Sequence, residues 1–195
     1  MENNKCLVLI SGGIDSAVAL FWAKYSGMVC EGLTFMYNNQ AKAEKKAIQY
    51  ICKNSNTQLN YVKHPLVGEN KKNLKDIFYP DNLLYYSIAI SFARQKEVKY
   101  IIGGQNKDDF QESKDAQTKF YENFNSILRT CYKNNIKIVQ PLINMTKEEV
   151  VKLGIKLKVP LEHTWSCQNK VSKPCNTCSS CITRSEISKK LNIRI

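Results

Sequence analysis

The sequence predicts an α/β fold in which helices cover both faces of a parallel β-sheet. Short apolar runs, typical of buried parallel strands, alternate along the chain with longer segments of helical periodicity. A Gly-Gly turn joins the first of these strands to the first helix. Ligands of such folds bind at the carboxyl ends of the strands, and the turn lies at one of these ends.

The N-terminal segments show the alternation clearly. The continuous apolar run Cys6–Ile10 predicts the first strand, and apolar residues at helical spacing from Ile14 to Tyr25 predict the first helix. Gly27 stands where this helix is expected to end. A strand, a helix and a short strand are then expected over Val29–Thr34, Gln40–Lys53 and Asn60–Lys63.

The central region begins where the periodicity is lost, over residues 64–80. A loop of this length inside a compact domain is expected to be mobile or functional. A helix is expected over Asn82–Lys96, and a strand over Tyr100–Ile102 that runs into Gly103 and Gly104. This second strand-plus-glycine pattern predicts another wall of the same crevice.

The C-terminal half continues the alternation. A helix, a strand and a final helix are expected over Gln117–Asn134, Lys137–Gln140 and Ile182–Leu191. The first of these helices is expected to face the core with Phe120, Phe124, Ile127, Leu128 and Cys131. Thr146 and Glu149 have the spacing of a capping box, which predicts a further helix that ends near Gly154.

The bulk properties indicate one domain, residues 1–195, with a formal net charge of +12. The lysines are spread through every segment without interleaved aromatic and arginine residues, so we expect no stable nucleic-acid partner. No apolar stretch is long enough to span a membrane, and residues 1–5 carry no signal-peptide pattern. These features predict a cytoplasmic protein without a membrane partner.

The turn after the first strand has the composition of a phosphate-binding site. Gly12 and Gly13 allow close approach of a ligand, and the following helix offers unpaired N–H groups and the positive end of its dipole. The hydroxyls of Ser11 and Ser16 can donate to phosphate oxygens, while Asp15 can hold Mg²⁺ or cap the helix. The loop lacks the lysine of a G-x-x-x-x-G-K-[ST] motif.

The eight cysteines fall into two groups. Four lie in apolar surroundings and are expected to be small core residues: Cys6, Cys30, Cys52 and Cys131. The other four are crowded together, as Cys167, Cys175, Cys178 and Cys181. Two-residue spacers let thiolates converge on one ion, which predicts a structural zinc site within residues 163–184, with an iron–sulfur cluster as the alternative.

Two further features have alternative interpretations. Asp108, Asp109, Glu112 and Asp115 form an acidic patch, which is either a solvated helix start or a set of ligands for Mg²⁺ or a base. Trp165 either stacks on a base or packs the cysteine loop against the domain. His163 lies in no recognisable catalytic dyad and is expected to be structural.

The motifs resemble those of known families. Ser-Gly-Gly-Ile-Asp-Ser at residues 11–16 resembles the S-G-G-x-D-S loop of the N-type ATP pyrophosphatases. The T-W-S-C sequence at 164–167, the cysteine triplet and Arg184, together with Tyr37, Gln40 and Glu44 in a Y-x-x-Q-x-x-x-E pattern, resemble the 7-cyano-7-deazaguanine synthase family, QueC. Two segments depart from its pattern, because no arginine precedes Asn82 and only Asp115 remains of an F/Y-P-D motif.

This resemblance implies a HUP-like (adenine nucleotide alpha hydrolase-like) Rossmannoid sandwich, commonly a homodimer, with one zinc ion per subunit. It implies that Asp15 and Ser16 are catalytic, within an ATP-binding stretch of Leu9, Ile10, Ser11, Gly12, Gly13, Ile14, Asp15, Ser16, Ala17, Val18 and Ala19. It further implies substrate contacts from Tyr37, Gln40, Asn82 and Asp115, and zinc ligation by Cys167, Cys175, Cys178 and Cys181.

The implied reaction converts 7-carboxy-7-deazaguanine, ammonia and ATP into the nitrile preQ0 through an adenylated intermediate, with Mg²⁺ accompanying ATP, for the synthesis of queuosine-type tRNA nucleosides. Two alternatives are a related adenylating enzyme, such as a tRNA sulfurtransferase or a deazaguanine-conjugating protein, and a non-enzymatic nucleotide- or RNA-binding module. A sulfurtransferase would need a free thiolate such as that of Cys131.

Overall fold

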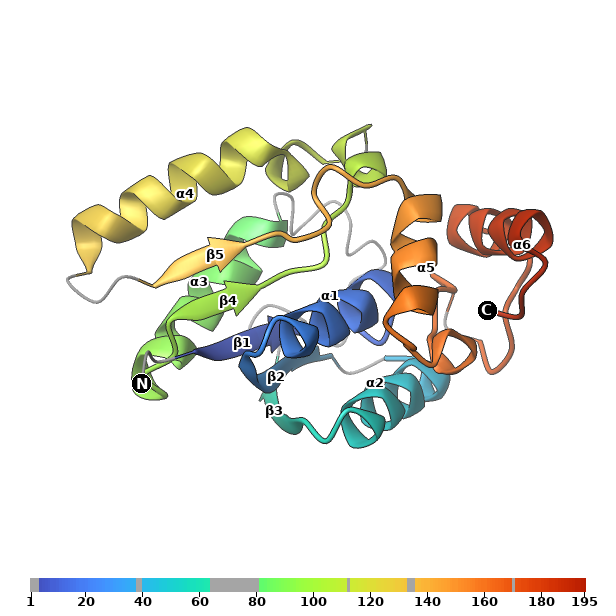
Figure 1. Cartoon of the computed structure of the whole chain (residues 1–195), viewed down its shortest axis with the longest axis horizontal. Helices are drawn as coiled ribbons and strands as arrows, with labels where there is room; N and C mark the ends of the chain where they lie inside the picture. The colour runs from blue at the N-terminus through green and yellow to red at the C-terminus, as the bar shows by residue number, and fades with distance from the viewer. Residues whose placement is uncertain (1–3, 38–39, 64–80, 112, 133–135, 170) are drawn as a thin grey trace.

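The computed structural model of the chain describes residues 4–37, 40–63, 81–111, 113–132, 136–169 and 171–195. Five strands form one parallel sheet in the order β3-β2-β1-β4-β5 (Figure 1). Their bounds are β1 Lys5–Leu9, β2 Val29–Met36, β3 Gln58–Lys63, β4 Tyr100–Ile102 and β5 Lys137–Val139. The predicted α/β class is therefore confirmed, and the segment 64–80, expected to be a loop, lies outside the described residues.

The described residues form six α-helices beside the sheet: α1 Ile14–Tyr25, α2 Lys42–Asn54, α3 Asp81–Gln95, α4 Thr118–Cys131, α5 Lys147–Lys156 and α6 Ser179–Leu191. Three short 3₁₀ segments lie between them, at Lys107–Gln111, Lys114–Ala116 and Leu161–His163. Within the described ranges, none of the helices is both long and apolar enough to cross a membrane.

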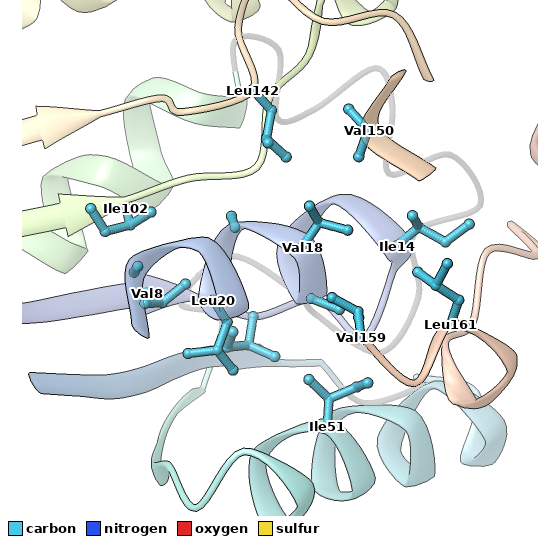
Figure 2. Close-up of a cluster of buried hydrophobic side chains, with 14 of the residues drawn as sticks. Val8, Ile14, Val18, Leu20, Ile51, Ile102, Leu142, Val150, Val159 and Leu161 are labelled. Carbon is cyan, nitrogen blue, oxygen red and sulfur yellow. The ribbon is translucent and has the colours of Figure 1, made fainter. Parts of the chain in front are cut away.

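The two faces of the sheet carry separate cores because side chains alternate along each strand. In β1, Cys6 and Val8 join the cluster formed with α1, α2 and α5, whereas Leu7 joins the cluster formed with α3 and α4. Figure 2 shows the first cluster, in which Ile14 and Val18 of α1 are gathered with Val150 of α5. Helix α1 thus packs between the sheet strands that it contacts and α5.

The chain order of the strands places a switch point between β1 and β4. From β1 the chain proceeds outward through β2 and β3, and it then returns to β4 on the other side of β1. Crevices for ligands form at the carboxyl ends of strands where the order reverses. The Ser11–Ser16 loop and the pair Gly103-Gly104 follow the two strands that flank this point.

The structure corrects two predicted core residues of α4. Tyr121, Phe124 and Leu128 are buried, but Ile127 is 56% exposed and Cys131 is exposed. Each helical residue is rotated by about 100° from the last, so Ile127 points away from the face that carries Leu128. Cys131 is the last residue of the helix, where the core no longer covers it.

Helix boundaries agree with the predictions except at a few ends. Helix α6 begins at Ser179 rather than Ile182, because the extended Cys178 serves as its N-cap. Helix α4 ends at Cys131 rather than Asn134. The capping box of α5 is confirmed: the backbone N of Glu149 donates to Oγ1 of Thr146 at 3.4 Å, and Oε2 of Glu149 accepts from the backbone N of Thr146 at 2.8 Å.

Candidate active site at the carboxyl edge of the sheet

The Ser11–Ser16 loop is closed by its own hydroxyl groups. Oγ of Ser16 accepts from the backbone N of Ser11 at 3.2 Å and donates to the carbonyl of Gly13 at 3.1 Å. The Ser11 and Ser16 hydroxyl oxygens are 3.2 Å apart. Gly12 has φ +79°, a conformation that favours glycine. The loop is thus preshaped around the N-terminal end of α1, where an anion is favoured.

Glycine is also required where the segment after β4 passes this loop. A Cβ atom at Gly104 would lie 2.7 Å from the backbone carbon of Asp15 and 2.8 Å from the backbone N of Ser16. Only a residue without a side chain permits that approach. The predicted second wall of the crevice is therefore in contact with the loop.

The cation that the loop itself lacks comes from α5. Nζ of Lys147 pairs with Oδ2 of Asp15, and the two side chains are only 22% and 24% exposed. Oδ1 of Asp15 is buried without a hydrogen-bond partner among the described residues. Asp15 therefore does not cap α1, contrary to one of its two interpretations, and it keeps an oxygen in position for a metal ion or a ligand donor.

Two cavities meet at the loop. The first, of about 360 Å³, lies over the ends of β1, β2 and β4 and includes Ile10, Thr34, Phe35 and Tyr85. The second, of about 400 Å³, extends toward α5 and α6 and includes Lys147, Trp165 and Arg184. Both are lined by Ser11, Asp15, Glu44 and Asp109, so the loop stands between them.

The predicted ATP-binding stretch divides between this edge and the core. Leu9, Ile10 and Ser16 line the first cavity, Gly13 and Ile14 line the second, and Ser11 and Asp15 line both. Ala17, Val18 and Ala19 are fully buried in the core, where they seat the first turn of α1. Gly12 contributes its carbonyl, which accepts from the backbone N of Trp165 at 2.8 Å.

Tyr37, Gln40 and Glu44 form one hydrogen-bonded group beside the first cavity. The Tyr37 hydroxyl donates to Oε2 of Glu44 at 2.9 Å, and Nε2 of Gln40 donates to Oε1 of Glu44 at 2.6 Å. Burial, followed by the charge of Glu44, raises the pKa of Tyr37, so this group stays a neutral donor. Oε1 of Gln40 is buried without a hydrogen-bond partner among the described residues.

Asn82 and Asp115 are brought together, but in different roles. Asn82 lines the first cavity, whereas Asp115 is 4% exposed and accepts at Oδ2 from the backbone N of Asn82 at 2.8 Å. The Ser113 hydroxyl donates to Oδ1 of Asp115. Asp115 therefore holds the start of α3, as expected for an acid at a helix N-terminus.

The other acids of the patch hold backbone groups around the loop. Oδ2 of Asp109 accepts from the backbone N of Asn106 at 2.9 Å, and Oδ2 of Asp108 accepts from the backbone N of Lys147 at 2.8 Å. Both acids also line the second cavity. Glu112 lies outside the described residues.

The four clustered cysteines form a group that can hold a metal ion. The Sγ atoms of Cys167, Cys175, Cys178 and Cys181 all lie within 4.8 Å of one another, and those of Cys175 and Cys181 are 3.9 Å apart. A tetrahedron with metal–sulfur bonds of 2.3 Å has edges of about 3.8 Å. The spacing fits one ion.

Backbone amides support this sulfur cluster. Sγ of Cys175 accepts from the backbone N of Cys178 at 3.3 Å and of Thr177 at 3.5 Å. Hydrogen bonds lower the pKa of Cys175 to about 5, and the largest contribution comes from the Thr177 side chain, followed by the backbone N–H groups of Thr177 and Cys178. These hydrogen bonds thus favour the thiolate of Cys175, the form that binds metals.

The cysteine loop is tied directly to the phosphate loop. The backbone N of Trp165 donates to Gly12, and its indole Nε1 donates to the carbonyl of Cys167 at 3.1 Å. Arg184 donates to the hydroxyls of Thr164 and Ser166 and to the carbonyl of Leu161 at 2.9 to 3.0 Å. The backbone of Trp165 therefore ties the loop to the domain, and the residue also lines the second cavity, while the rings of His163 and Tyr50 stack with centroids 3.7 Å apart.

Sequence patterns did not reveal every residue of the site. Lys147 appears only as the residue after the capping threonine, and nothing in the local pattern indicates that its amine reaches Asp15, 132 positions earlier. Phe35, Tyr85 and Gln105 of the first cavity were also missed. Their positions at a strand end or the start of a helix are the only signal that could have found them.

The loop at the switch point, the lysine that reaches it and the tethered cysteine cluster define a protein of the N-type ATP pyrophosphatase class. The model of the family described as "Queuosine biosynthesis protein QueC" matches residues 5–74 and 64–192. The chain belongs to this family, QueC.

Individual relatives agree with this assignment. The chain is similar to the 7-cyano-7-deazaguanine synthase of Methanobrevibacter smithii, with 30% identity over 100% of this chain and 97% of that protein. It is also similar to the 7-cyano-7-deazaguanine synthase of Picrophilus torridus, with 31% identity over 92% of this chain and 85% of the relative.

Solved structures share the fold. The NMN synthetase from Francisella tularensis superposes with a TM-score of 0.62 at 16% identity, covering 100% of this chain and 79% of that one. The U34-tRNA thiolase NcsA from Methanococcus maripaludis, with its [4Fe-4S] cluster, gives 0.55 at 17% identity over 96% of this chain and 65% of that one.

Proposed function

We propose that the chain is an ATP-dependent ligase that converts 7-carboxy-7-deazaguanine and ammonia into 7-cyano-7-deazaguanine. Membership of the QueC family supports the substrate, since relatives that match nearly the whole chain are named for this product. The observation that carries the chemistry is the preshaped Ser11–Ser16 loop with Lys147 paired to Asp15.

A carboxylate reacts with ammonia only after one of its oxygens becomes a good leaving group. Attack of that oxygen on the α-phosphorus of ATP releases pyrophosphate and forms an acyl adenylate. Ammonia then displaces AMP to give the amide. Repetition of the activation on the amide oxygen, followed by loss of AMP and a proton, gives the nitrile.

The residues of the loop suit the departing pyrophosphate. The N-terminal end of α1 and the hydroxyls of Ser11 and Ser16 offer donors, and Nζ of Lys147 adds a positive charge. Catalysis in this scheme is chiefly positioning and electrostatic stabilisation. Oδ1 of Asp15, which has no hydrogen-bond partner in the described part of the chain, fits a ligand of Mg²⁺, which would offset the phosphate charge when bound.

The cysteine cluster is proposed to hold zinc in a structural role. Four thiolates leave no open position on a tetrahedral ion, and the Sγ spacing fits a single ion better than a larger cluster. The site would fix the segment that connects Trp165 to Gly12, and so the shape of the second cavity.

The homodimer implied by the family resemblance and the cytoplasmic location predicted from the sequence also belong to this proposal. Light scattering coupled to size-exclusion chromatography measures the first directly. A mass of twice the chain is expected, and a monomer at working concentration would remove this part of the proposal.

The proposed function is tested by measuring the conversion of 7-carboxy-7-deazaguanine by the purified protein. The zinc-loaded protein with Mg-ATP, ammonium and 7-carboxy-7-deazaguanine is expected to accumulate amide and then nitrile, read by mass spectrometry, with pyrophosphate released in step. Asp15→Asn should abolish both signals. An unchanged carboxylate in the presence of the intact protein would contradict the proposed acceptor.

A further inference from the structure

A chain of side-chain hydrogen bonds runs from the core to the wall of the first cavity. Nε2 of Gln140, at the end of β5, donates to the Tyr86 hydroxyl at 2.7 Å. The Tyr86 hydroxyl donates to Oε1 of Gln105 at 2.8 Å, and Nε2 of Gln105 donates to Oδ1 of Asn82 at 2.9 Å. Asn82 and Gln105 both line the cavity.

The donor-to-acceptor direction of this series of hydrogen bonds follows from the single hydrogen of the Tyr86 hydroxyl. Tyr86 is fully buried, and burial raises its pKa, so the group stays protonated. Since it accepts from Gln140, its own hydrogen goes to Gln105, whose amide then donates to Asn82. The Oδ1 of Asn82 is thereby occupied, and no hydrogen bond among the described residues uses its Nδ2.

The backbone makes room for this arrangement. A Cβ atom at Gly103 would overlap the Tyr86 hydroxyl and lie 2.9 Å from Oε1 of Gln140. A phenylalanine in place of Tyr86 would fill the same apolar space without a buried hydroxyl to satisfy. The buried hydroxyl is instead present and is hydrogen-bonded on both sides, to Gln140 and Gln105.

We propose that Gln140, Tyr86 and Gln105 are positioning residues that orient the Asn82 amide to donate a hydrogen bond to the edge of a planar base in the first cavity. The rings of Phe35 and Tyr85, with centroids 4.8 Å apart, belong to the same cavity and offer apolar faces to such a base. The ligand is a purine-like heterocycle with an acceptor on its edge.

Two ligands of the proposed reaction have this chemistry: the adenine of ATP and the 7-deazaguanine. The inference rests on the proposed function for the second of them only. Binding measurements keep the two apart, with a non-hydrolysable ATP analogue and 7-carboxy-7-deazaguanine titrated separately by calorimetry.

The test compares two tyrosines of one core. Tyr86→Phe removes the hydroxyl at the centre of the relay, the hydrogen-bonded series Gln140–Tyr86–Gln105–Asn82. Tyr121→Phe removes the hydroxyl of a neighbour, 5% exposed and 5.5 Å away between ring centroids, that is not a member of this series. Tyr86→Phe should weaken the binding of one of the two probes by about tenfold. The KM for the corresponding substrate should rise, while kcat stays within about twofold of the unmodified protein. Tyr121→Phe should leave both probes as in the unmodified protein.

Gln140→Met is a second variant that removes the first donor of the relay and should weaken the same probe. The proposed relay would be overturned if Tyr86→Phe bound both probes as tightly as the unmodified protein does. It would also be overturned if the two tyrosine variants lost the same affinity. The two proposals fail differently. If the unmodified protein binds the ATP analogue but not the deazaguanine, the acceptor of the proposed function is wrong, and the ATP titration still decides the relay.

Discussion

At the scale of single residues, a lysine and an aspartate from distant parts of the chain set the charge of the site. Lys147 and Asp15 are both mostly buried, and their pairing compensates two charges that would be costly apart. A phosphate group that enters the loop offers the lysine a second anionic partner. The residue is therefore placed to stabilise charge on a departing pyrophosphate.

Lys147→Ala is expected to lower kcat/KM for pyrophosphate release by roughly 100-fold, as removal of one such donor does elsewhere. The measurement is a coupled pyrophosphate assay at saturating ammonium. Lys152→Ala is the matched control, since that lysine lies on the same helix but pairs with Glu148 at the surface. Equal activity of the two variants would contradict the role of Lys147.

At the scale of elements, helix α5 carries Lys147 and depends on its capping box. Hydrogen bonds from the Thr146 backbone and hydroxyl keep the pKa of Glu149 below its ordinary value. The folded state thus favours the charged carboxylate. The resulting stability is present above the ordinary pKa of a glutamate and is lost as the pH falls through the lowered folded value.

Glu149→Gln should accordingly reduce stability near neutral pH and lose its effect in acid. Urea unfolding at pH 7 and at pH 3 measures this, and glutamine preserves the geometry of a capping box. The difference in the free energy of unfolding between the variant and the unmodified protein is expected to disappear at the lower pH. A difference of the same size at both pH values would show that the charge of Glu149 does not contribute to the stability of the capping box.

The cysteine loop is the second element with a separable role. Cys178→Ser should abolish stoichiometric zinc, measured by plasma mass spectrometry, and lower the melting temperature, because the metal would organise a segment with few apolar residues. Cys131→Ser, at the exposed end of α4, should change neither metal content nor nitrile formation. Loss of activity in Cys131→Ser would instead favour sulfur transfer.

At the scale of the whole molecule, most elements of the fold could be predicted from local sequence patterns. The strands of the sheet were predictable because apolar runs in a parallel sheet are buried on both faces, and the cysteine spacing alone predicted a metal site that the Sγ distances support. Cys131 and Ile127 were misplaced because periodicity identifies a helix but not the extent of its buried face.

The arrangement of the site was less accessible, because it depends on contacts between remote elements. Nothing in the sequence places Gly104 against the Asp15 backbone, or Tyr86 between Gln105 and Gln140. Such contacts follow from the strand order, which sends β4 back beside β1. The switch point explains why residues from separate segments meet at one loop.

The measurement that tests the central claim most directly is isotope transfer from the carboxylate to AMP. With 7-carboxy-7-deazaguanine labelled with ¹⁸O in both carboxylate oxygens, activation at the α-phosphorus predicts AMP that carries one ¹⁸O atom in each of the two activation steps, read by mass spectrometry. Nitrile formation with unlabelled AMP, or with the label in phosphate or pyrophosphate, would contradict adenylation as the route.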